Sequence, residues 1–476
     1  MGFEDYSDYD ALGLAALIRE GEVSAREVTE AAIERIEALN PTLNAVMYKA
    51  FDEALEAADE GLPDGPFSGV PFLIKDLDLA VGSWPQSNGS RYTQNARNDE
   101  DAELASRYRD AGLNFLGTTN TPEYGITGTT ESALLGPCRN PWNPGHSTGG
   151  SSGGAAAAVA SGMVPMAHAT DGLGSIRIPA ACCGLFGLKP TRDRTPMAPN
   201  YREASHGFVC QHVVSRTVRD SAALLDATDY RDPLLPAPAP SKDRPYLQEL
   251  KIAPGRLRIA FSTRTPTGKP IDPEVQATID TVTRVLDAMG HYVEEKDLDL
   301  DWRSFYFAQA IKSASHFTAE FRHRVAQMGR EPEESELEPL TWLILNGAKN
   351  ITGEMTGEAT RSLFAFSSEI LRQLGRYDAF VTPVMTAPAA EIGYIDPVGL
   401  DPAEVNKRQG KLYPFTPPFN ITGQPSMSLP LGQSSSGLPI GVMITARYGD
   451  EATLFRVASQ LEEEMPWIGR RPPNWN

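Results

Sequence analysis

The first sixty residues show apolar side chains at the spacing of helices. The segment Ser24–Glu27 has the form of a capping box, and apolar residues then recur at helical spacing as far as Leu39. The dipeptide Asn40-Pro41 predicts the end of this helix, because the residue before a proline disfavours the helical conformation. Residues 48–58 repeat a helical pattern. We therefore expect residues 1–68 to form a helical N-terminal segment.

From residue 69 onward, short apolar runs alternate with helical patterns. Residues 70–74 have the pattern of a buried strand, and residues 100–111 have that of an amphipathic helix. Such alternation is typical of an α/β protein, in which helices pack on a sheet. Further strands are expected at 115–117, 163–169, 257–261, 292–295, 379–382, 426–429 and 440–445, and further helices at 155–161, 273–289, within 301–375 and at 452–463.

One proline-rich stretch interrupts this alternation. Four of the eight residues from 233 to 240 are prolines, which favours an extended and exposed path. The same alternation resumes after it, so we interpret residues 232–247 as a crossover within one domain that spans residues 1–476. We predict a central mixed β-sheet flanked by helices. Its chemistry is expected in residues 69–231, and residues 248–476 supply the rest of the sheet and covering helices.

Composition narrows the function classes. The chain has 476 residues, of which 41% are hydrophobic and 22% charged, as in a soluble globular protein with a large core. The formal net charge of −19 disfavours a nucleic-acid partner, which requires clustered lysine and arginine. No window approaches about eighteen uninterrupted apolar residues, and the acidic N-terminus lacks the pattern of a signal peptide. We expect a cytoplasmic protein without a membrane partner.

Cysteines and histidines do not point to a metal or a cofactor. The four cysteines lack metal-binding spacing and are expected to be buried thiols in a reducing compartment. None of the seven histidines has metal-ligand spacing to a cysteine, a carboxylate or another histidine. We therefore predict no metal and no cofactor.

Lys75 directly follows the apolar run 70–74 and precedes Asp76. An ordinary lysine at a strand end extends its ammonium group to water. A lysine in a poorly solvated pocket instead has a lowered pKa and, when neutral, accepts protons. This segment alone is compatible with both roles.

A glycine-rich segment at 149–154 carries Ser151 and Ser152. It satisfies the Gly-x-Ser-x-Gly pattern of a nucleophile elbow, although a turn signal at Asn143–Gly145 precedes it where an elbow needs a strand. It lacks the Gly-Lys-Ser/Thr ending of a phosphate-binding loop. A serine hydroxyl becomes a nucleophile only beside a base, so the segment is a candidate for acyl-transfer chemistry.

A second glycine-rich segment, Thr170–Arg177, contains another serine, Ser175. Its backbone N–H groups are suited to lining one concavity, as an oxyanion site requires. Asp171 and Arg177 are opposite charges that flank this turn, and we expect them to pair and fix its shape. Two hydroxyls, a lysine and clustered glycines together suit acyl transfer without a histidine.

These residues resemble the amidase signature family. The stretch 149–191 is similar to the defining motif of that family, and segments 69–76 and 119–123 are similar to two further blocks. Segments 140–143 and 419–425 resemble two more, so the likeness covers most of the chain. Within the family, the chain looks most similar to bacterial amidases of the 6-aminohexanoate cyclic-dimer hydrolase type.

The resemblance implies a Ser–cis-Ser–Lys triad. By matching position, Ser175 is the acyl nucleophile, Ser151 relays its proton from a cis peptide bond, and neutral Lys75 is the base. The oxyanion hole implied by the family falls on the backbone of Gly172, Leu173, Gly174 and Ser175, and structural support falls on Ser152, Asp171 and Arg177. Many members have glycine at the position of Leu173 and lysine at that of Thr118, which leaves the triad untouched.

The resemblance leaves the substrate open. We expect a hydrolase that cleaves the C–N bond of a small uncharged linear amide, anilide, lactam, cyclic oligoamide or carbamate. The alternative is the glutamine-hydrolysing subunit of a tRNA-dependent amidotransferase, which usually has glutamine where this chain has Ile178. A third possibility keeps Ser151 as an elbow nucleophile with a distant Asp and His. A homodimer is a family-level expectation. Candidate pocket walls are Tyr124, His146, Ile178, Met197 and His316.

Overall fold

Eleven strands form one sheet in the part of the chain that the computed structural model describes, which comprises residues 3–197, 207–230, 238–473 and 475. The strands are β1 Val46–Lys49, β2 Pro71–Lys75, β3 Asn114–Thr119, β8 Met166–Asp171, β9 Phe186–Lys189, β10 Cys210–Ser215, β11 Arg258–Phe261, β12 Tyr292–Glu295, β13 Ala379–Pro383, β14 Ser426–Gln433 and β15 Pro439–Ala446.

The sheet is mixed. Its order is β1-β3-β2-β8-β10-β9-β14-β15-β13-β11-β12. The pairs β2–β3, β2–β8, β11–β13 and β11–β12 are parallel, and the other pairs are antiparallel. Four short strands form two separate ribbons: β4 Glu131–Ser132 with β5 Gly136–Pro137, and β6 Arg139–Asn140 with β7 Asn143–Ser147. The predicted α/β class with a central mixed sheet is confirmed.

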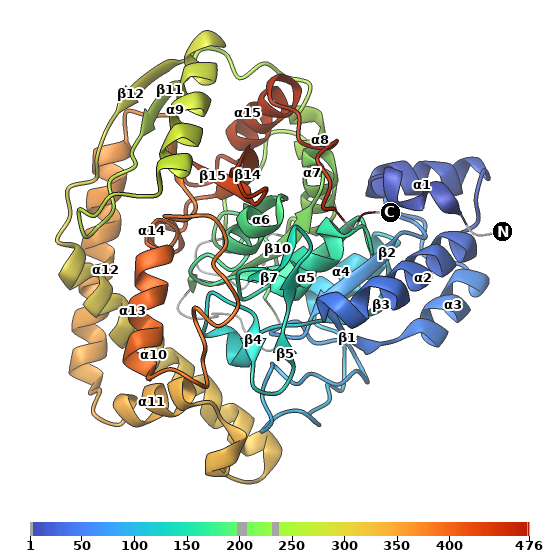
Figure 1. Cartoon of the computed structure of the whole chain (residues 1–476), viewed down its shortest axis with the longest axis horizontal. Coiled ribbons are helices and arrows are strands. Elements are labelled where there is room, and N and C mark those ends of the chain that lie inside the picture. Colours follow the sequence, from blue (N-terminus) through green and yellow to red (C-terminus); the bar gives the residue numbers. More distant parts are fainter. Residues whose placement is uncertain (1–2, 198–206, 231–237, 474, 476) are drawn as a thin grey trace.

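Helices cover the sheet and both of its ends. In the described residues they are α1 Ala11–Glu20, α2 Ala25–Leu43, α3 Phe51–Glu60, α4 Glu103–Asp110, α5 Gly153–Ala160, α6 Arg177–Cys183, α7 Val218–Thr228, α8 Tyr246–Glu249, α9 Pro273–Ala288, α10 Trp302–Met328, α11 Pro339–Ala348, α12 Gly353–Leu374, α13 Pro402–Leu412, α14 Pro417–Thr422 and α15 Glu451–Glu464. Figure 1 shows α1–α3 at the end of the molecule that holds both termini, and α10–α12 at the opposite end.

Two large apolar clusters make up most of the core. One apolar cluster contains the buried residues of α5 and α6, and a second contains those of α9 and α15. Helix α5 is built almost entirely from glycine and alanine, and all of its residues are buried. Small side chains therefore allow this helix to pack closely against the sheet, which places the loop before it, including Ser151, over the strand ends.

Two predictions about the N-terminal segment are wrong. Helix α2 continues through Pro41 to Leu43, because a proline in the last turn removes only one helical hydrogen bond. Asn40 then holds the chain that follows, since its Oδ1 accepts from the N–H groups of Ala45 and Val46 at 2.8 and 2.7 Å. Tyr48 belongs to strand β1, which pairs antiparallel with β3, so the helical pattern from 48 begins only at Phe51.

The proline-rich crossover falls partly outside the described residues, which omit 231–237. Strands on both sides of it nevertheless belong to the same sheet, because β14 pairs with β9 and β11 joins through β13 and β15. The described residues before and after the crossover therefore contribute to one sheet, and the single domain over residues 1–476 stays a prediction.

All four cysteines are free thiols, and all four are buried. None of the described helices combines the length and apolarity that crossing a bilayer requires.

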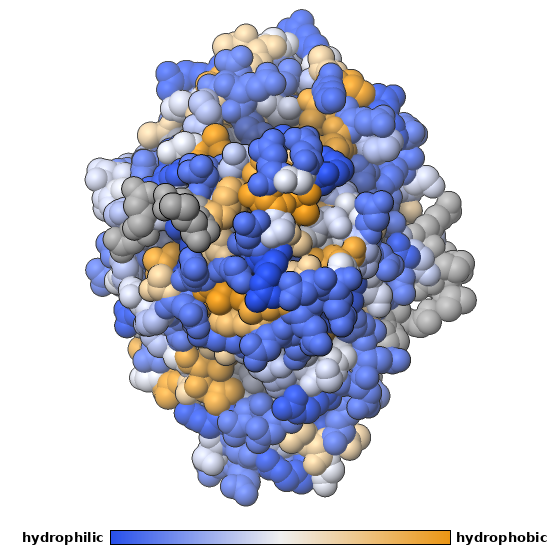
Figure 2. Space-filling model, turned by 90° about the vertical axis from the view of Figure 1, so that its right-hand side faces the viewer, coloured by the Kyte–Doolittle hydropathy of each residue, from blue (hydrophilic) through white to orange (hydrophobic). Residues whose placement is uncertain are grey.

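Figure 2 shows that the face on the side of α1–α3 is mainly hydrophilic, with apolar patches between polar ones. The cytoplasmic location and the homodimer stay predictions.

Candidate active site

Lys75 lies at the carboxyl end of β2 and is completely buried. Strand β8 runs parallel to β2, so the carboxyl ends of both strands meet at one edge of the sheet. There the Lys75 Nζ donates to Ser151 Oγ at 2.7 Å and to Thr170 Oγ1 at 2.8 Å. Strand pairing therefore brings together a lysine and two hydroxyls that are far apart in sequence.

Burial lowers the proton affinity of Lys75. Desolvation lowers the pKa of Lys75 to about 7, although the nearby carboxylates of Asp78 and Asp171 favour its charged form. Its two hydrogen-bond partners are neutral hydroxyls rather than carboxylates. A substantial share of Lys75 is therefore neutral at physiological pH, as proton acceptance requires.

Ser151 lies in the loop that leads into α5. The peptide bond between Gly150 and Ser151 is cis. Gly125 lies close to the side chain of Ser151, because a Cβ added at this glycine would lie 3.1 Å from Ser151 Oγ. The neighbouring Ser152 is fully buried, and its Oγ donates to Thr170 O at 3.2 Å. This bond ties the Ser151 loop to the strand that carries Thr170.

Ser175 lies in the turn between β8 and α6, and it is partly exposed. Ile178, in the first turn of α6, connects this turn with the Ser151 loop. A Cβ added at Gly149 would lie 3.0 Å from Ile178 Cγ2, and a Cβ added at Gly174 would lie 2.7 Å from Ile178 Cδ1. The two glycine-rich segments are therefore adjacent, with Ile178 packed between them.

The backbone of residues 172–175 differs from the prediction at one position. The Gly174 N–H donates to Asp171 Oδ1 at 2.7 Å, so it is occupied and unsuited to binding an oxyanion. The prediction that Gly174 supplies a donor is therefore wrong. Position 174 requires glycine, because φ is +136° and a Cβ there would clash with the hydroxyl of Thr416. The remaining candidate donors are Gly172, Leu173 and Ser175.

Asp171 organises the turn through a buried ion pair. Its carboxylate accepts from Arg177 Nε and Nη2, both at 2.9 Å, and both side chains are fully buried. Burial alone would raise the pKa of Asp171, but the charge and hydrogen bonds of Arg177, aided by Asn420, hold it well below the usual range. The pairing that the sequence predicted is present, and it fixes the backbone around Ser175.

Three residues of this network were not predicted from the sequence. Thr170 positions Lys75, Thr416 donates to Leu173 O at 2.6 Å, and Asn420 Nδ2 donates to Asp171 Oδ1 at 2.9 Å. Thr416 and Asn420 come from the loop and helix α14, over 240 residues away from the turn they hold. The block 419–425, noted for its resemblance, was the available signal for Asn420.

The predicted pocket walls other than Ile178 have these surroundings. The Tyr124 ring packs against Phe317 and Phe321 of α10, directly before the glycine that faces Ser151. His146 lies on β7, and its backbone forms an isolated antiparallel β-bridge with that of Glu391. The Met197 Sδ accepts from Gln211 Nε2 at 3.2 Å, and His316 Nε2 pairs with Glu320 at 2.9 Å. Their roles toward a substrate stay predictions.

Asp78 links the surroundings of Lys75 to helix α10. Asp78 lies in the loop after β2, and burial raises the pKa of its carboxyl. Arg324, Lys75 and His316 lower this pKa, and Glu320 raises it. Arg324 Nη2 is 3.9 Å from Asp78 Oδ1. Helix α10 therefore brings polar and charged groups to the side of the site where Lys75 lies.

Possible metal ligands near the site are side chains of His, Cys, Asp and Glu. Across the described ranges, no cluster of three or more His, Cys, Asp or Glu side chains has a geometry that would hold a metal ion. His168, next to the site on β8, is engaged at both ring nitrogens, by Lys75 N–H at Nδ1 and by Gln211 at Nε2.

Comparison with known proteins identifies the family. The family model described as "Amidase" matches residues 27–455. The chain belongs to the amidase signature family. It is 38% identical over 481 aligned residues to the 6-aminohexanoate-cyclic-dimer hydrolase of Paenarthrobacter ureafaciens, covering 97% of this chain and 96% of that protein.

Solved structures agree with this family assignment. Two structures of 6-aminohexanoate cyclic dimer hydrolase, one complexed with substrate, match this amidase with a TM-score of 0.93 and 36% identity. The match covers 99% of this amidase and 99% and 100% of those chains. A bacterial aryl acylamidase of the amidase signature family matches with a TM-score of 0.88 at 28% identity, covering 98% of this chain and 99% of the other.

Proposed function

We propose that this amidase hydrolyses the C–N bond of small uncharged amides through an acyl-enzyme on Ser175. The observation that carries the proposal is the buried Lys75, whose Nζ donates to Ser151 Oγ at 2.7 Å beside the Ser175 turn. A neutral amine in that place accepts a proton from one hydroxyl, which in turn accepts a proton from the next.

The first half of the reaction forms an ester. Ser175 Oγ attacks the amide carbon, its proton moves to Ser151 Oγ, and the Ser151 proton moves to Lys75 Nζ. The negative carbonyl oxygen accepts hydrogen bonds from N–H groups of the turn, for which Gly172, Leu173 and Ser175 are the candidates. When the C–N bond breaks, the proton held by Lys75 returns through Ser151 to the departing nitrogen.

The second half restores the enzyme. A water molecule attacks the ester carbon and loses a proton along the same route to Lys75. Collapse of this second intermediate breaks the bond to Ser175 Oγ, which regains its proton through Ser151. The products are a carboxylic acid and an amine, and the route needs no metal or redox partner.

For the substrate, we propose uncharged amides with apolar bodies, of which cyclic oligoamides and anilides are the leading classes. Relatives named 6-aminohexanoate cyclic dimer hydrolase and aryl acylamidase support this choice. Ile178 adds an apolar side chain, 3% exposed, next to the Ser175 turn. The alternative, glutamine hydrolysis within a tRNA-dependent assembly, fits less well with Ile178 and with a net charge of −19.

A turnover panel tests the substrate class. We expect hydrolysis of the cyclic dimer of 6-aminohexanoate and of an acyl anilide, measured by release of amine. The linear dimer of 6-aminohexanoate is the matched control, because it contains the same amide bond but carries charged ends; we expect it to react at least about tenfold more slowly. Glutamine should release no ammonia. Preference for glutamine over every uncharged amide would contradict the proposal.

We expect activity to rise with pH through neutrality. The base must be unprotonated, and burial lowers the pKa of Lys75 to about 7, so kcat/KM for an uncharged anilide should fall about tenfold per pH unit below that value and level off above about pH 8. The measurement is a kcat/KM profile from acidic to mildly alkaline pH.

Asp76 provides the control for this profile, because burial also raises the pKa of its carboxyl to about 7. Its carboxylate accepts from the backbone N–H of Ser87 at 3.0 Å rather than contacting Lys75. The variant Asp76→Asn should therefore retain the same acidic limb. Loss of the limb in this variant would assign the titration to Asp76 and remove Lys75 as the titrating base.

A further inference from the structure

The segment 149–153, which carries Ser151, has few side chains that could hold its shape. Three of its five residues are glycine. Glycine has more backbone freedom than any other residue, so a segment of this composition needs contacts from elsewhere to keep one conformation. Proton transfer from Ser175 through Ser151 to Lys75 depends on where this segment holds the Ser151 hydroxyl. The contacts that fix the segment therefore bear on the reaction.

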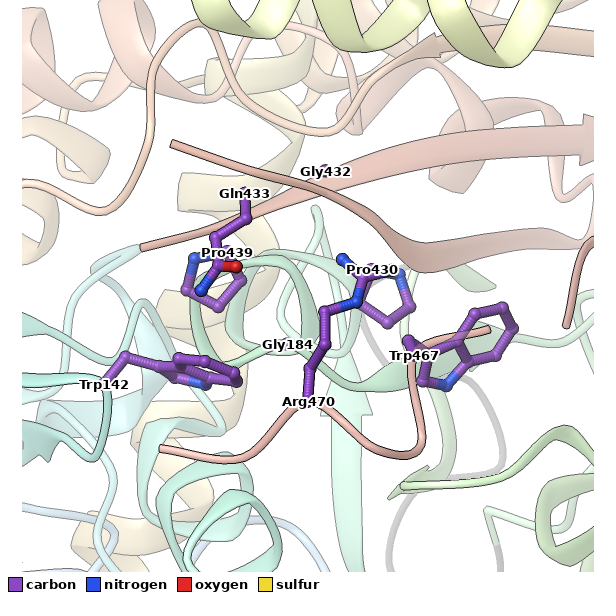
Figure 3. A pocket seen from close by; sticks show the side chains of 8 residues that line it. All are labelled: Trp142, Gly184, Pro430, Gly432, Gln433, Pro439, Trp467 and Arg470. Atoms are coloured by element: carbon purple, nitrogen blue, oxygen red, sulfur yellow. The ribbon is translucent and has the colours of Figure 1, made fainter. Parts of the chain in front are cut away.

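The chain just before this segment is held by Asn140 and Trp142. Asn140 Nδ2 donates to Ser147 O at 3.0 Å, and Trp142 Nε1 donates to Cys183 O, at the end of α6, at 2.8 Å. Figure 3 shows the Trp142 indole at a small hollow that Gly184, the residue after α6, also lines. These contacts fix the chain as far as Ser147, so other contacts hold the segment that follows.

Two contacts hold the segment at single points. Thr121 Oγ1 donates to the carbonyl oxygen of Ser151 at 3.1 Å. Ser152 Oγ donates to the carbonyl oxygen of Thr170 at 3.2 Å. Each of these bonds reaches one residue of the segment, so neither of them sets the distance between its two ends.

Thr130 contacts both ends of the segment. Its hydroxyl donates to Gly149 O at 2.9 Å and accepts from the Gly153 N–H at 3.2 Å. The side chain is fully buried, and a Cβ added at Gly153 would clash with this hydroxyl. Thr148 Oγ1 also donates to Gly149 O, at 3.2 Å, but Thr148 belongs to the same stretch of chain. The Thr130 hydroxyl therefore bridges the residues on either side of Ser151.

The backbone around Thr130 is itself well anchored. Its carbonyl oxygen accepts from the Cys138 N–H at 2.8 Å. The next residue, Glu131, begins β4, and its Oε2 accepts from the Gly393 N–H at 2.8 Å. Thr130 thus holds the segment from a fixed position. Both hydrogen bonds of its hydroxyl go to the backbone of the segment, so Thr130 would act on the reaction only through Ser151.

We propose that Thr130 is a positioning residue: by joining Gly149 O to the Gly153 N–H, it holds Ser151 Oγ where this oxygen exchanges protons with Ser175 and Lys75. The proposal rests on the proposed function, in which Ser151 relays these protons. Proton transfer requires hydrogen-bond distances, so a small displacement of the relaying hydroxyl slows the chemical step. Binding of the substrate does not require the relay, and the loss therefore falls on kcat rather than on KM.

The variant Thr130→Val tests this role, because it keeps the shape of the side chain and removes the hydroxyl. For the amide that the parent cleaves fastest, we expect kcat to fall at least about tenfold, with KM little changed. The nitrophenyl ester of the same acid is the second substrate, and its kcat/KM should fall much less. Nitrophenolate leaves without taking up a proton, whereas the amine needs the proton that Ser151 delivers. A smaller fraction of folded enzyme would instead lower both activities equally.

Three further variants serve as controls. Thr130→Ser keeps the hydroxyl and should retain a kcat close to that of the parent. Thr228→Val is the matched control, because Thr228 is also fully buried but donates to Leu224 O within α7, at 2.7 Å; its kcat should be unchanged. If Thr130→Val gives no folded protein, Thr130→Ala and Thr130→Ser provide the same comparison, since they differ from each other by one hydroxyl.

Three results would overturn the proposal: an unchanged kcat in Thr130→Val, equal losses toward the amide and the ester, and a loss in Thr130→Ser as large as that in Thr130→Val. The variant Ser151→Ala separates this proposal from the proposed function. Full amide activity in Ser151→Ala would refute the relay and with it the role of Thr130. An inactive Ser151→Ala beside a fully active Thr130→Val would refute the role of Thr130 alone.

Discussion

Replacement of Ser175 by alanine is expected to reduce kcat for amide hydrolysis by about 10⁴-fold or more, because no other hydroxyl would form the acyl-enzyme. Protein yield and melting temperature should stay close to those of the parent, since the side chain is partly exposed at the turn. The measurement is single-substrate kinetics together with mass spectrometry of a trapped acyl adduct, which should locate on the peptide that contains Ser175.

Two further serine variants sharpen this test. Ser151→Ala should also lower kcat strongly, because it breaks the path from Ser175 to Lys75. Ser161→Ala is the matched control: Ser161 is buried at the end of α5 and donates only to Ala158 O, so kcat should change little. Full activity of Ser175→Ala, with none in Ser151→Ala, would instead make Ser151 an elbow nucleophile.

The structure already argues against the elbow hypothesis. A catalytic elbow needs a histidine at the nucleophile. Here the group that bonds Ser151 Oγ is Lys75 Nζ, while the nearby His168 is bonded through its ring nitrogens to Lys75 N–H and Gln211. Burial also lowers the pKa of His168 to about 3, so it stays neutral throughout the physiological range.

Local patterns predicted the elements that carry the site. The run of apolar residues before Lys75 predicted β2, and burial of that strand on both faces explains why its pattern was continuous rather than alternating. Likewise, the small residues after Ser151 predicted α5. These two elements could be predicted from local patterns, because strand burial and helix packing select the types of residues that are adjacent in the sequence.

Contacts between distant segments were beyond these patterns. The resemblance to a family supplied the pairing of Lys75 with Ser151, which are 76 residues apart, whereas no pattern indicated Thr170 as the second partner of Lys75. The use of the Gly174 N–H by Asp171 was also invisible, because it depends on how the turn closes on a carboxylate. Sequence spacing shows that glycines are present, but not which N–H groups stay free.

The buried Asp171–Arg177 pair connects the stability of the fold with the shape of the site. Arg177 donates twice to Asp171 and also to Thr416 O at 3.1 Å, while Asn420 Nδ2 donates to Asp171 Oδ1 at 2.9 Å. The same carboxylate accepts from Gly174 N–H at 2.7 Å. One ion pair therefore joins the turn of Ser175 to α14.

We expect Arg177→Met to destabilise the protein by about 3–5 kcal/mol, because it leaves the Asp171 charge buried without a cation. For a chain of 476 residues this corresponds to a fall in melting temperature of about 3–5 °C. In the parent the lowered pKa of Asp171 means that the pair contributes stability above the normal carboxyl pKa and loses it as pH falls. In the variant the charge and hydrogen bonds of Arg177 are lost, so burial raises the pKa of Asp171 relative to the parent, although Asn420 and the Gly174 N–H still donate to it. Protonation then relieves part of the cost, and the difference in stability should shrink toward acidic pH.

Arg361→Met is the matched control for this loss. Arg361 pairs with Glu358 on the exposed face of α12, with 76% and 57% of the two side chains exposed. The variant Arg361→Met should lower the free energy of unfolding by less than about 0.5 kcal/mol. Thermal unfolding of both variants at neutral and mildly acidic pH is the measurement. Equal falls in melting temperature, or a difference for Arg177→Met that grows as the pH decreases, would mean that Asp171 is not held as a buried carboxylate by Arg177.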